Sequence, residues 1–263
     1  MDSSHSPLMC IGNCAAFYRF IFPVFMEKLR LLLSDTSEKD LQTLFQTVAN
    51  ELMCNHIIQK GEHQYEIVEI EFYYYSPEHR DVITYPRDMQ AGRWFFHQSG
   101  VDITFASQGV EKLQDGKFRY ENAHFGGVLI RGLRRRSDGE YIFGPLKCTY
   151  ELWDHFDAFG ILSANEYPIL KEHQGVATPN LRACKRCINI KKEKKEQETQ
   201  IAEWAGRIGL DWKQADIEKD IENYAKDLFE DSDKYLYRYF NLPNYEYEML
   251  KNIPSNARPK DII

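Results

Sequence analysis

The sequence predicts an α+β fold, in which helices and strands are mixed along one chain. The segment from Tyr65 to Tyr75 is rich in Val, Ile, Phe and Tyr and contains neither Gly nor Pro, which is typical of a β-strand. The segment from Leu41 to Leu52 places apolar residues at helical spacing. The chain has 263 residues, of which 43% are hydrophobic and 14% aromatic, so it is long enough to bury a sizeable core.

Alternation along the 65–75 strand predicts one core face and one face that carries two carboxylates. A solvent-exposed outer face is the ordinary interpretation of such a pattern. The functional interpretation is that a carboxylate beside aromatic surface loses water and is tuned toward general-base work. The predicted core face is Glu66, Val68, Ile70, Phe72 and Tyr74, and the predicted second face is Tyr65, Ile67, Glu69, Glu71, Tyr73 and Tyr75.

The other elements are predicted from shorter signals. Ser34 to Ser37 is expected to cap the helix that contains Leu41 to Leu52, with Glu38 and Asp40 in its first turn. Asn55 and Gly61 bracket a short strand, and a turn at residues 143–147 is expected to open a helix that continues through Phe156. Further strands are expected over residues 93–97, 101–105, 125–133 and 235–242, and further helices over residues 201–204 and 217–228.

Arg131 lies on the same predicted strand face as Leu129 and Leu133. A guanidinium on an apolar face requires an anionic partner, because burial without one is costly. That partner could be a structural carboxylate, a phosphate or Glu71. The arginines at 134–136 that follow are expected to form a solvated hairpin shoulder.

The formal net charge of −7 does not favour a general nucleic-acid binder, which usually has a basic footprint. A basic run from Arg182 to Lys195 is either a solvated loop or the best electrostatic candidate for nucleic-acid contact. Six scattered cysteines indicate a reduced, cytoplasmic protein rather than a disulfide scaffold. The C-x-x-C pair of Cys184 and Cys187 has no second pair at zinc-site spacing, so ordinary thiols are expected.

Residues 8–25 are apolar, but Arg19 and Pro23 interrupt them and no basic residue precedes them. This pattern fits neither a signal peptide nor a full membrane span, so no membrane partner is expected. The segment is expected to be an extension, or to lie upstream of a true start at Met26. The predicted organisation is an extension over residues 1–33, one domain over residues 34–253 and a tail over residues 254–263.

Taken in order, six motifs between Asp35 and Leu242 resemble those of the alkyladenine (3-methyladenine) DNA glycosylases of the vertebrate and Bacillus type. The family has a helix pattern A-x-x-L-L/M-G, strand patterns I/V-V-E-T-E-A-Y and V-L-L/I-R, then G-P-x-K, R-I/V-G-I/V and a closing R-F-Y. No single motif is specific, and their order carries the resemblance. The matching segments here are Val48–Met53, Ile67–Tyr73, Val128–Leu133, Gly144–Lys147, Arg207–Leu210 and Arg238–Phe240.

The resemblance implies a single mixed domain built on a curved antiparallel sheet flanked by helices, the scaffold that is also seen in formyltransferase C-terminal domains. It implies hydrolysis of the N-glycosidic bond of a damaged purine that is flipped out of DNA, as in base excision repair, by a monomer without metal or cofactor. Glu71 would be the general base, Arg131 would lie beside the catalytic water, and Tyr73 would stack on the flipped base. The other implied contacts are His79, Phe96, His97 and Ser99 to the substrate, and Lys147, Arg182 and Arg207 to nucleic acid.

Ser99 occupies the position of the family's wedge, the large side chain that fills the gap left by the flipped nucleotide. A serine is too small to fill that gap, and the chain is acidic where the family is basic. Two alternatives therefore stand beside a DNA glycosylase. One is a hydrolase of RNA, single-stranded DNA or a free nucleotide, and the other is a non-catalytic module that binds a base.

Overall fold

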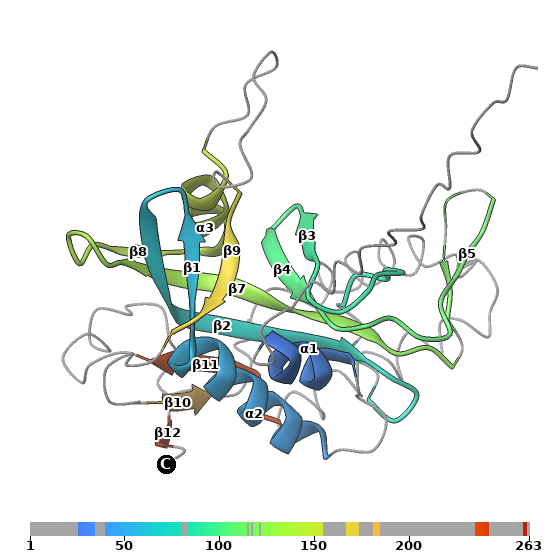
Figure 1. Cartoon of the computed structure of the whole chain (residues 1–263). Helices are drawn as coiled ribbons and strands as arrows, with labels where there is room; N and C mark the ends of the chain where they lie inside the picture. Colours follow the sequence, from blue (N-terminus) through green and yellow to red (C-terminus); the bar gives the residue numbers. More distant parts are fainter. Residues whose placement is uncertain are drawn as a thin grey trace, which may run out of the picture.

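The chain folds into a mixed α+β structure around a strongly curled antiparallel sheet (Figure 1), which confirms the predicted α+β class. This computed structural model describes residues 26–34, 40–79, 81, 84–114, 116, 118–120, 122–154, 167–173, 181–184, 235–241 and 260–261. Within these ranges the helices are α1 (Met26–Ser34), α2 (Leu41–Cys54) and α3 (Pro145–Leu152).

The strands of the curled sheet range from two to thirteen residues in length. They are β1 (His56–Lys60), β2 (His63–Tyr75), β3 (Trp94–His97), β4 (Gly100–Thr104), β7 (Phe125–Arg135), β8 (Tyr141–Phe143), β9 (Ile169–Glu172), β10 (Leu181–Cys184), β11 (Arg238–Asn241) and β12 (Lys260–Asp261). A separate two-stranded ribbon is formed by β5 (Glu111–Lys112) and β6 (Phe118–Arg119).

The long strands β2 and β7 form the centre of the sheet and pair along almost their whole length. The order across the sheet is β12-β10-β11-β2-β7-β4-β3, β1 pairs with β2 and β9, and β8 pairs with β7. Figure 1 shows β1 and β9 rising on one side of this centre and β3 and β4 on the other, with α1 and α2 below it. The core face of the curled sheet packs against residues of α1, α2 and α3.

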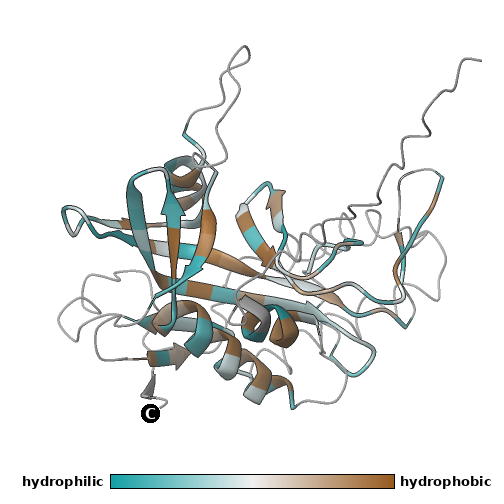
Figure 2. Ribbon diagram, viewed as in Figure 1, coloured by the Kyte–Doolittle hydropathy of each residue, from teal (hydrophilic) through white to brown (hydrophobic). Residues whose placement is uncertain are grey.

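Helix α2 forms as the periodicity predicts and buries Leu44, Phe45, Val48 and Leu52. Figure 2 shows the resulting alternation of apolar and polar residues along this helix. Its N-cap is Asp40, whose carboxylate accepts the backbone N–H of Thr43 at 2.9 Å, so the prediction that Ser34–Ser37 caps this helix is wrong. Ser34 instead ends α1, which was not predicted and which contributes Leu29 and Leu33 to the core.

The face assignment of β2 is correct after Val68 and wrong before it. The main core contains Tyr65, Ile67, Ile70, Phe72 and Tyr74, so the interval between core residues changes from two to three at residues 67–70. The pairing with β7 is irregular on both sides of Glu69. Such an irregularity places two consecutive side chains on one face. It turns Val68 away from the main core, into a second cluster with Cys184 and Phe240.

The remaining predicted elements agree with the structure in kind and differ in extent. Strands appear at each predicted position up to residue 133, and the turn at 143–147 opens α3, which ends at Leu152 rather than continuing through Phe156. Of the strand predicted over residues 235–242, only β11 (Arg238–Asn241) forms among the described residues. Strands β8, β9 and β10 were not predicted, because each is only three or four residues long and lies in no longer apolar or aromatic run. The helices predicted at 201–204 and 217–228 lie outside the described residues.

Helix α1 lies within the predicted N-terminal extension and packs into the main core, and β12 lies within the predicted tail and pairs with β10. None of the helices in the described ranges has the length and apolar character needed to cross a membrane.

Candidate active site

A buried ion pair joins the two predicted catalytic residues. Glu71 lies on β2 and Arg131 on the neighbouring strand β7, and Nη1 of Arg131 donates to Oε2 of Glu71 at 2.7 Å. Glu71 is only 5% exposed and the Arg131 side chain 23% exposed. Of the three partners that the sequence left open for Arg131, the structure selects Glu71 together with a second carboxylate, Glu69.

The charges on these residues compensate each other. Burial by itself lowers the pKa of the Arg131 guanidinium, but the attraction of Glu71 and Glu69 outweighs burial, so that this pKa lies above its ordinary value. Arg131 therefore remains a cation at every accessible pH. It provides a fixed positive charge beside the Glu71 carboxylate.

Glu69 extends the pair into a network of two carboxylates and two guanidiniums. Its Oε1 accepts Nε of Arg131 at 2.9 Å and Nε of Arg238 at 2.7 Å, and Nη2 of Arg238 is a further partner. Arg238 belongs to β11, whose pairing places it directly opposite Glu71. The role of Arg238 was not predicted, because more than 160 residues separate it from Glu69 and only the strand order brings them together.

Gly132 makes the close approach of the two central strands possible. A Cβ at this position would lie 2.8 Å from Cβ of Glu69, closer than real Cβ atoms approach, and 3.2 Å from Cγ2 of Val68, a tight contact. The missing side chain therefore lets Glu69 lie against β7 beside Arg131. The strand motif in the sequence contains Gly132, but nothing in the local sequence indicates this close approach.

Tyr73 follows Glu71 by two residues and so lies on the same face of β2. It is half-buried, and it is one of the groups that raise the pKa of the Arg131 guanidinium, so it lies near the pair. Its cross-strand neighbour on β7 is Gly127, and the space that a Cβ would fill there is occupied by the side chains of Arg87 and Asp102. Glu71, Arg131 and Tyr73 thus form one site on the sheet face opposite the main core.

Phe96 lies on the other face of the sheet. Strand pairing aligns Glu71 with Leu129, Leu129 with Asp102, and Asp102 with Phe95. Phe95 and not Phe96 therefore shares the face of Glu71, because side chains alternate along β3. Phe96 is 50% exposed and packs edge-on against Trp153 at a ring-centroid distance of 4.8 Å. The sheet separates the two aromatic rings that the resemblance would place around one base.

His97 belongs to a second buried polar group, formed with Asp102 and Arg87. Nε2 of His97 lies 3.0 Å from Oδ1 of Asp102, and Nη1 of Arg87 donates to Oδ2 of Asp102 at 2.6 Å. Ser99 donates its backbone N–H to Nδ1 of His97 at 3.2 Å, so the ring carries its proton on Nε2, toward Asp102. Burial lowers the pKa of the Arg87 guanidinium, and the neighbouring Asp102 opposes that effect.

His79 lies against the core side of the sheet. Its Nε2 is 3.1 Å from the hydroxyl of Tyr237, and its ring packs edge-on against Tyr235. Tyr237 belongs to the main core cluster. The structure therefore brings together Glu71, Arg131 and Tyr73 and places His79 elsewhere.

The predicted nucleic-acid contacts are dispersed. Lys147 is exposed on α3, Arg182 is half-buried on β10 opposite Phe240, and Arg207 lies outside the described residues. The arginines at 134–136 pair with acidic residues of the same region, as for Arg134 with Glu66 at 2.9 Å. Cys184 is buried on β10, and Cys187 lies outside the described residues.

Within the described ranges, no group of three or more His, Cys, Asp and Glu side chains is arranged to hold a metal ion. Searches against family models, curated proteins and solved structures give no match to the chain.

Proposed function

We propose that the chain is an N-glycosyl hydrolase that removes a damaged or modified purine from DNA, built on a scaffold of the alkyladenine glycosylase type. The observation that carries this proposal is the buried pair of Glu71 and Arg131 on a sheet face that also carries Tyr73. A carboxylate, a fixed cation and an aromatic ring are the groups that such a reaction needs. The local resemblance of both central strands to that family supports the same assignment.

In the proposed reaction, Glu71 accepts a proton from a water molecule as the water oxygen attacks C1′ of the sugar. The bond between C1′ and the base nitrogen breaks, and its electron pair leaves with the purine. Arg131 holds the Glu71 carboxylate in place through the hydrogen bond from its Nη1 atom. Tyr73 stacks on the flipped base, and one such contact is worth about 1–3 kcal/mol against a flipping cost of a few kcal/mol.

A second candidate is a non-catalytic module that binds a base on the same scaffold. The network favours it in one respect, since two carboxylates and two guanidiniums already balance each other. Charged networks of this kind also stabilise folds without any catalytic role. Phe96 and Tyr73 lie on opposite faces of the sheet, so they cannot stack on the two sides of one base. This also favours a site in which a base stacks on one ring only.

Two features of the chain favour one kind of substrate over duplex DNA. Ser99 cannot fill the gap of a flipped nucleotide, and the clustered arginines at 134–136 already have acidic partners. Both points favour single-stranded nucleic acid or a nucleotide over duplex DNA as the alternative substrate of the same hydrolase. Duplex binding through phosphates would show a steep loss of affinity with salt, whereas a nucleotide site would not.

The test is release of free base from duplex and single-stranded oligonucleotides that carry hypoxanthine, ethenoadenine or an alkylated purine. Glu71→Gln should lose about 10²–10⁴-fold of the rate, the usual worth of a general base, while it retains binding. Glu66→Gln is the matched control, because it removes a carboxylate from the same strand that also pairs with an arginine. Its rate should equal that of the wild type.

Equal loss in both variants would mean that the effect is structural and would overturn the role of Glu71. If a folded wild-type protein releases no base but binds the oligonucleotides, the hydrolase assignment fails and the binding module replaces it. If it neither releases nor binds, both proposals fail.

A further inference from the structure

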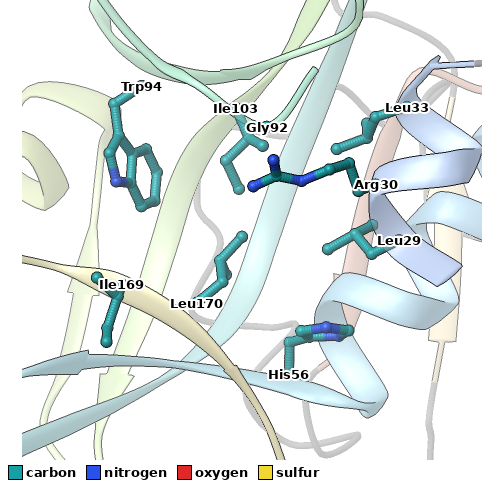
Figure 3. Close-up of a pocket in the computed structure, with 9 residues that line it drawn as sticks. All are labelled: Leu29, Arg30, Leu33, His56, Gly92, Trp94, Ile103, Ile169 and Leu170. Carbon is teal, nitrogen blue, oxygen red and sulfur yellow. The ribbon is translucent and has the colours of Figure 1, made fainter. Parts of the chain in front are cut away.

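A pocket opens on the sheet face opposite Glu71 (Figure 3). It lies between helix α1, strands β1 and β9, and strands β3 and β4. Its wall is apolar and comes from separate elements: Leu29 and Leu33 of α1, Ile103 of β4 and Leu170 of β9. Two polar side chains, Arg30 and His56, also line it. A concave apolar site with a few polar groups is the usual form of a small-molecule site.

The walls of this pocket are held in place before any ligand binds. Nε1 of Trp94 donates to the carbonyl of Pro168 at 3.0 Å, which fixes the indole against the segment that leads into β9. Nδ1 of His56 lies 2.8 Å from the carbonyl of Glu51 and must donate to it, because a carbonyl only accepts. Leu29 and Leu33 belong to the main core. A preformed wall binds a ligand without the entropy cost of ordering it.

Arg30 supplies the charge of the pocket. Figure 3 shows its side chain reaching from α1 across the pocket, with the guanidinium near Ile103 and Gly92. Among the described side chains, no carboxylate forms an ion pair with this guanidinium, in contrast to Arg131 and Arg238. A cation over apolar surface selects a ligand that has an apolar body and one anionic group.

We propose that this pocket binds a small apolar carboxylic acid, with the carboxylate on Arg30 and the hydrocarbon part against Leu29, Ile103 and Leu170. The cavity measures about 180 Å³. An apolar cavity of about 150 Å³ accommodates benzene, so this one takes a single ring or a branched chain of similar size. The planar guanidinium holds a carboxylate by two parallel hydrogen bonds, which fixes the orientation of the ligand.

This site is independent of the proposed hydrolase. Ile103 follows Asp102 on β4, so it points to the opposite face from the row that contains Asp102, Leu129 and Glu71. Loss of Glu71 chemistry would leave the pocket unchanged, and loss of the pocket cation would leave the Glu71 site unchanged.

The experiment is calorimetric titration of the full chain with phenylacetate and with its neutral counterpart phenylacetamide. Wild-type protein should bind phenylacetate several-fold more tightly than phenylacetamide. Arg30 is exposed, so solvent screens its pairing with a carboxylate, and Arg30→Met should weaken phenylacetate binding by about two- to fivefold and should leave phenylacetamide binding unchanged. Lys171→Met is the matched control, because it removes an exposed cation from β9, the strand that carries Leu170.

A further variant tests the location. Ile169 lies at the rim of the pocket and is 44% exposed, so Ile169→Trp should fold and should obstruct entry of both ligands. Three results would overturn the proposal: no binding of phenylacetate to the wild type, equal binding of acid and amide, or equal losses in Arg30→Met and Lys171→Met.

Discussion

Arg131 and Glu71 come from neighbouring strands, and Nη1 of the arginine lies 2.7 Å from Oε2 of the glutamate on a buried face of the sheet. Glu69 shares the same guanidinium through its Nε atom. Three charged groups from two strands are therefore held where the register of β2 and β7 is irregular.

Loss of the Arg131 charge should be strongly destabilising. Arg131→Met leaves Glu69 and Glu71 buried with less compensation, and breaking one side of a buried pair costs about 3–5 kcal/mol. The expected effect is a loss near the low end of this range, since Arg131 is 23% exposed. Urea unfolding followed by circular dichroism measures it. Arg134→Met, which breaks a more exposed pair with Glu66, should cost less than about 1 kcal/mol.

Gly132→Ala should destabilise the protein through crowding alone. The new Cβ would meet Cβ of Glu69 at 2.8 Å and Cδ1 of Phe143 at 3.1 Å, and the φ of Gly132 is not positive. Overpacking of this kind costs about 1–3 kcal/mol. The midpoint of urea unfolding should fall, whereas Ser137→Ala in the exposed turn of the same hairpin should leave it in place. Equal midpoints for both variants would contradict the close approach of β2 and β7.

The buried pair of Arg87 and Asp102 predicts strong coupling between the two residues. Their side chains are 1% and 2% exposed, so Arg87→Met alone should cost about 3–5 kcal/mol by leaving a buried carboxylate without its guanidinium. The double variant Arg87→Met/Asp102→Leu should be more stable than Arg87→Met. A double-mutant cycle in urea measures this difference. Additive losses would show that the carboxylate does not depend on Arg87.

Alkaline pH should weaken the fold through Cys148. Burial raises the pKa of this thiol from 9.0 to about 12, so the folded state holds the proton more tightly than the unfolded state. The stabilisation is complete below about pH 9 and is lost as the pH rises from there toward 12. The unfolding free energy of the wild type should therefore fall with pH above 9, and Cys148→Ala should show a smaller slope. Identical slopes would show that the thiol titrates alike in both states.

The sequence by itself determined the elements with long periods. The apolar spacing of Leu44, Val48 and Leu52 fixed α2, and the β-branched and aromatic content of residues 65–75 fixed β2, because local side-chain patterns decide these preferences. It also predicted that Arg131 needs an anion, although the predicted face is only half right: Leu129 shares the face of Arg131, whereas the irregular pairing at this point turns Leu133 into the main core. Glu71 and Tyr73 were placed on one face by alternation, which holds beyond Val68.

Only the tertiary structure decided which distant residues meet. The pairing of β11 with β2 brings Arg238 to Glu69, and the order of β3, β4, β7 and β2 puts Phe96 on the face away from Glu71. The shift at Glu69 reversed the first half of β2, because a backbone irregularity leaves no mark in the hydrophobic pattern until the partner strand is known. Strand order and register are properties of the whole sheet, so they could not be derived from any single segment.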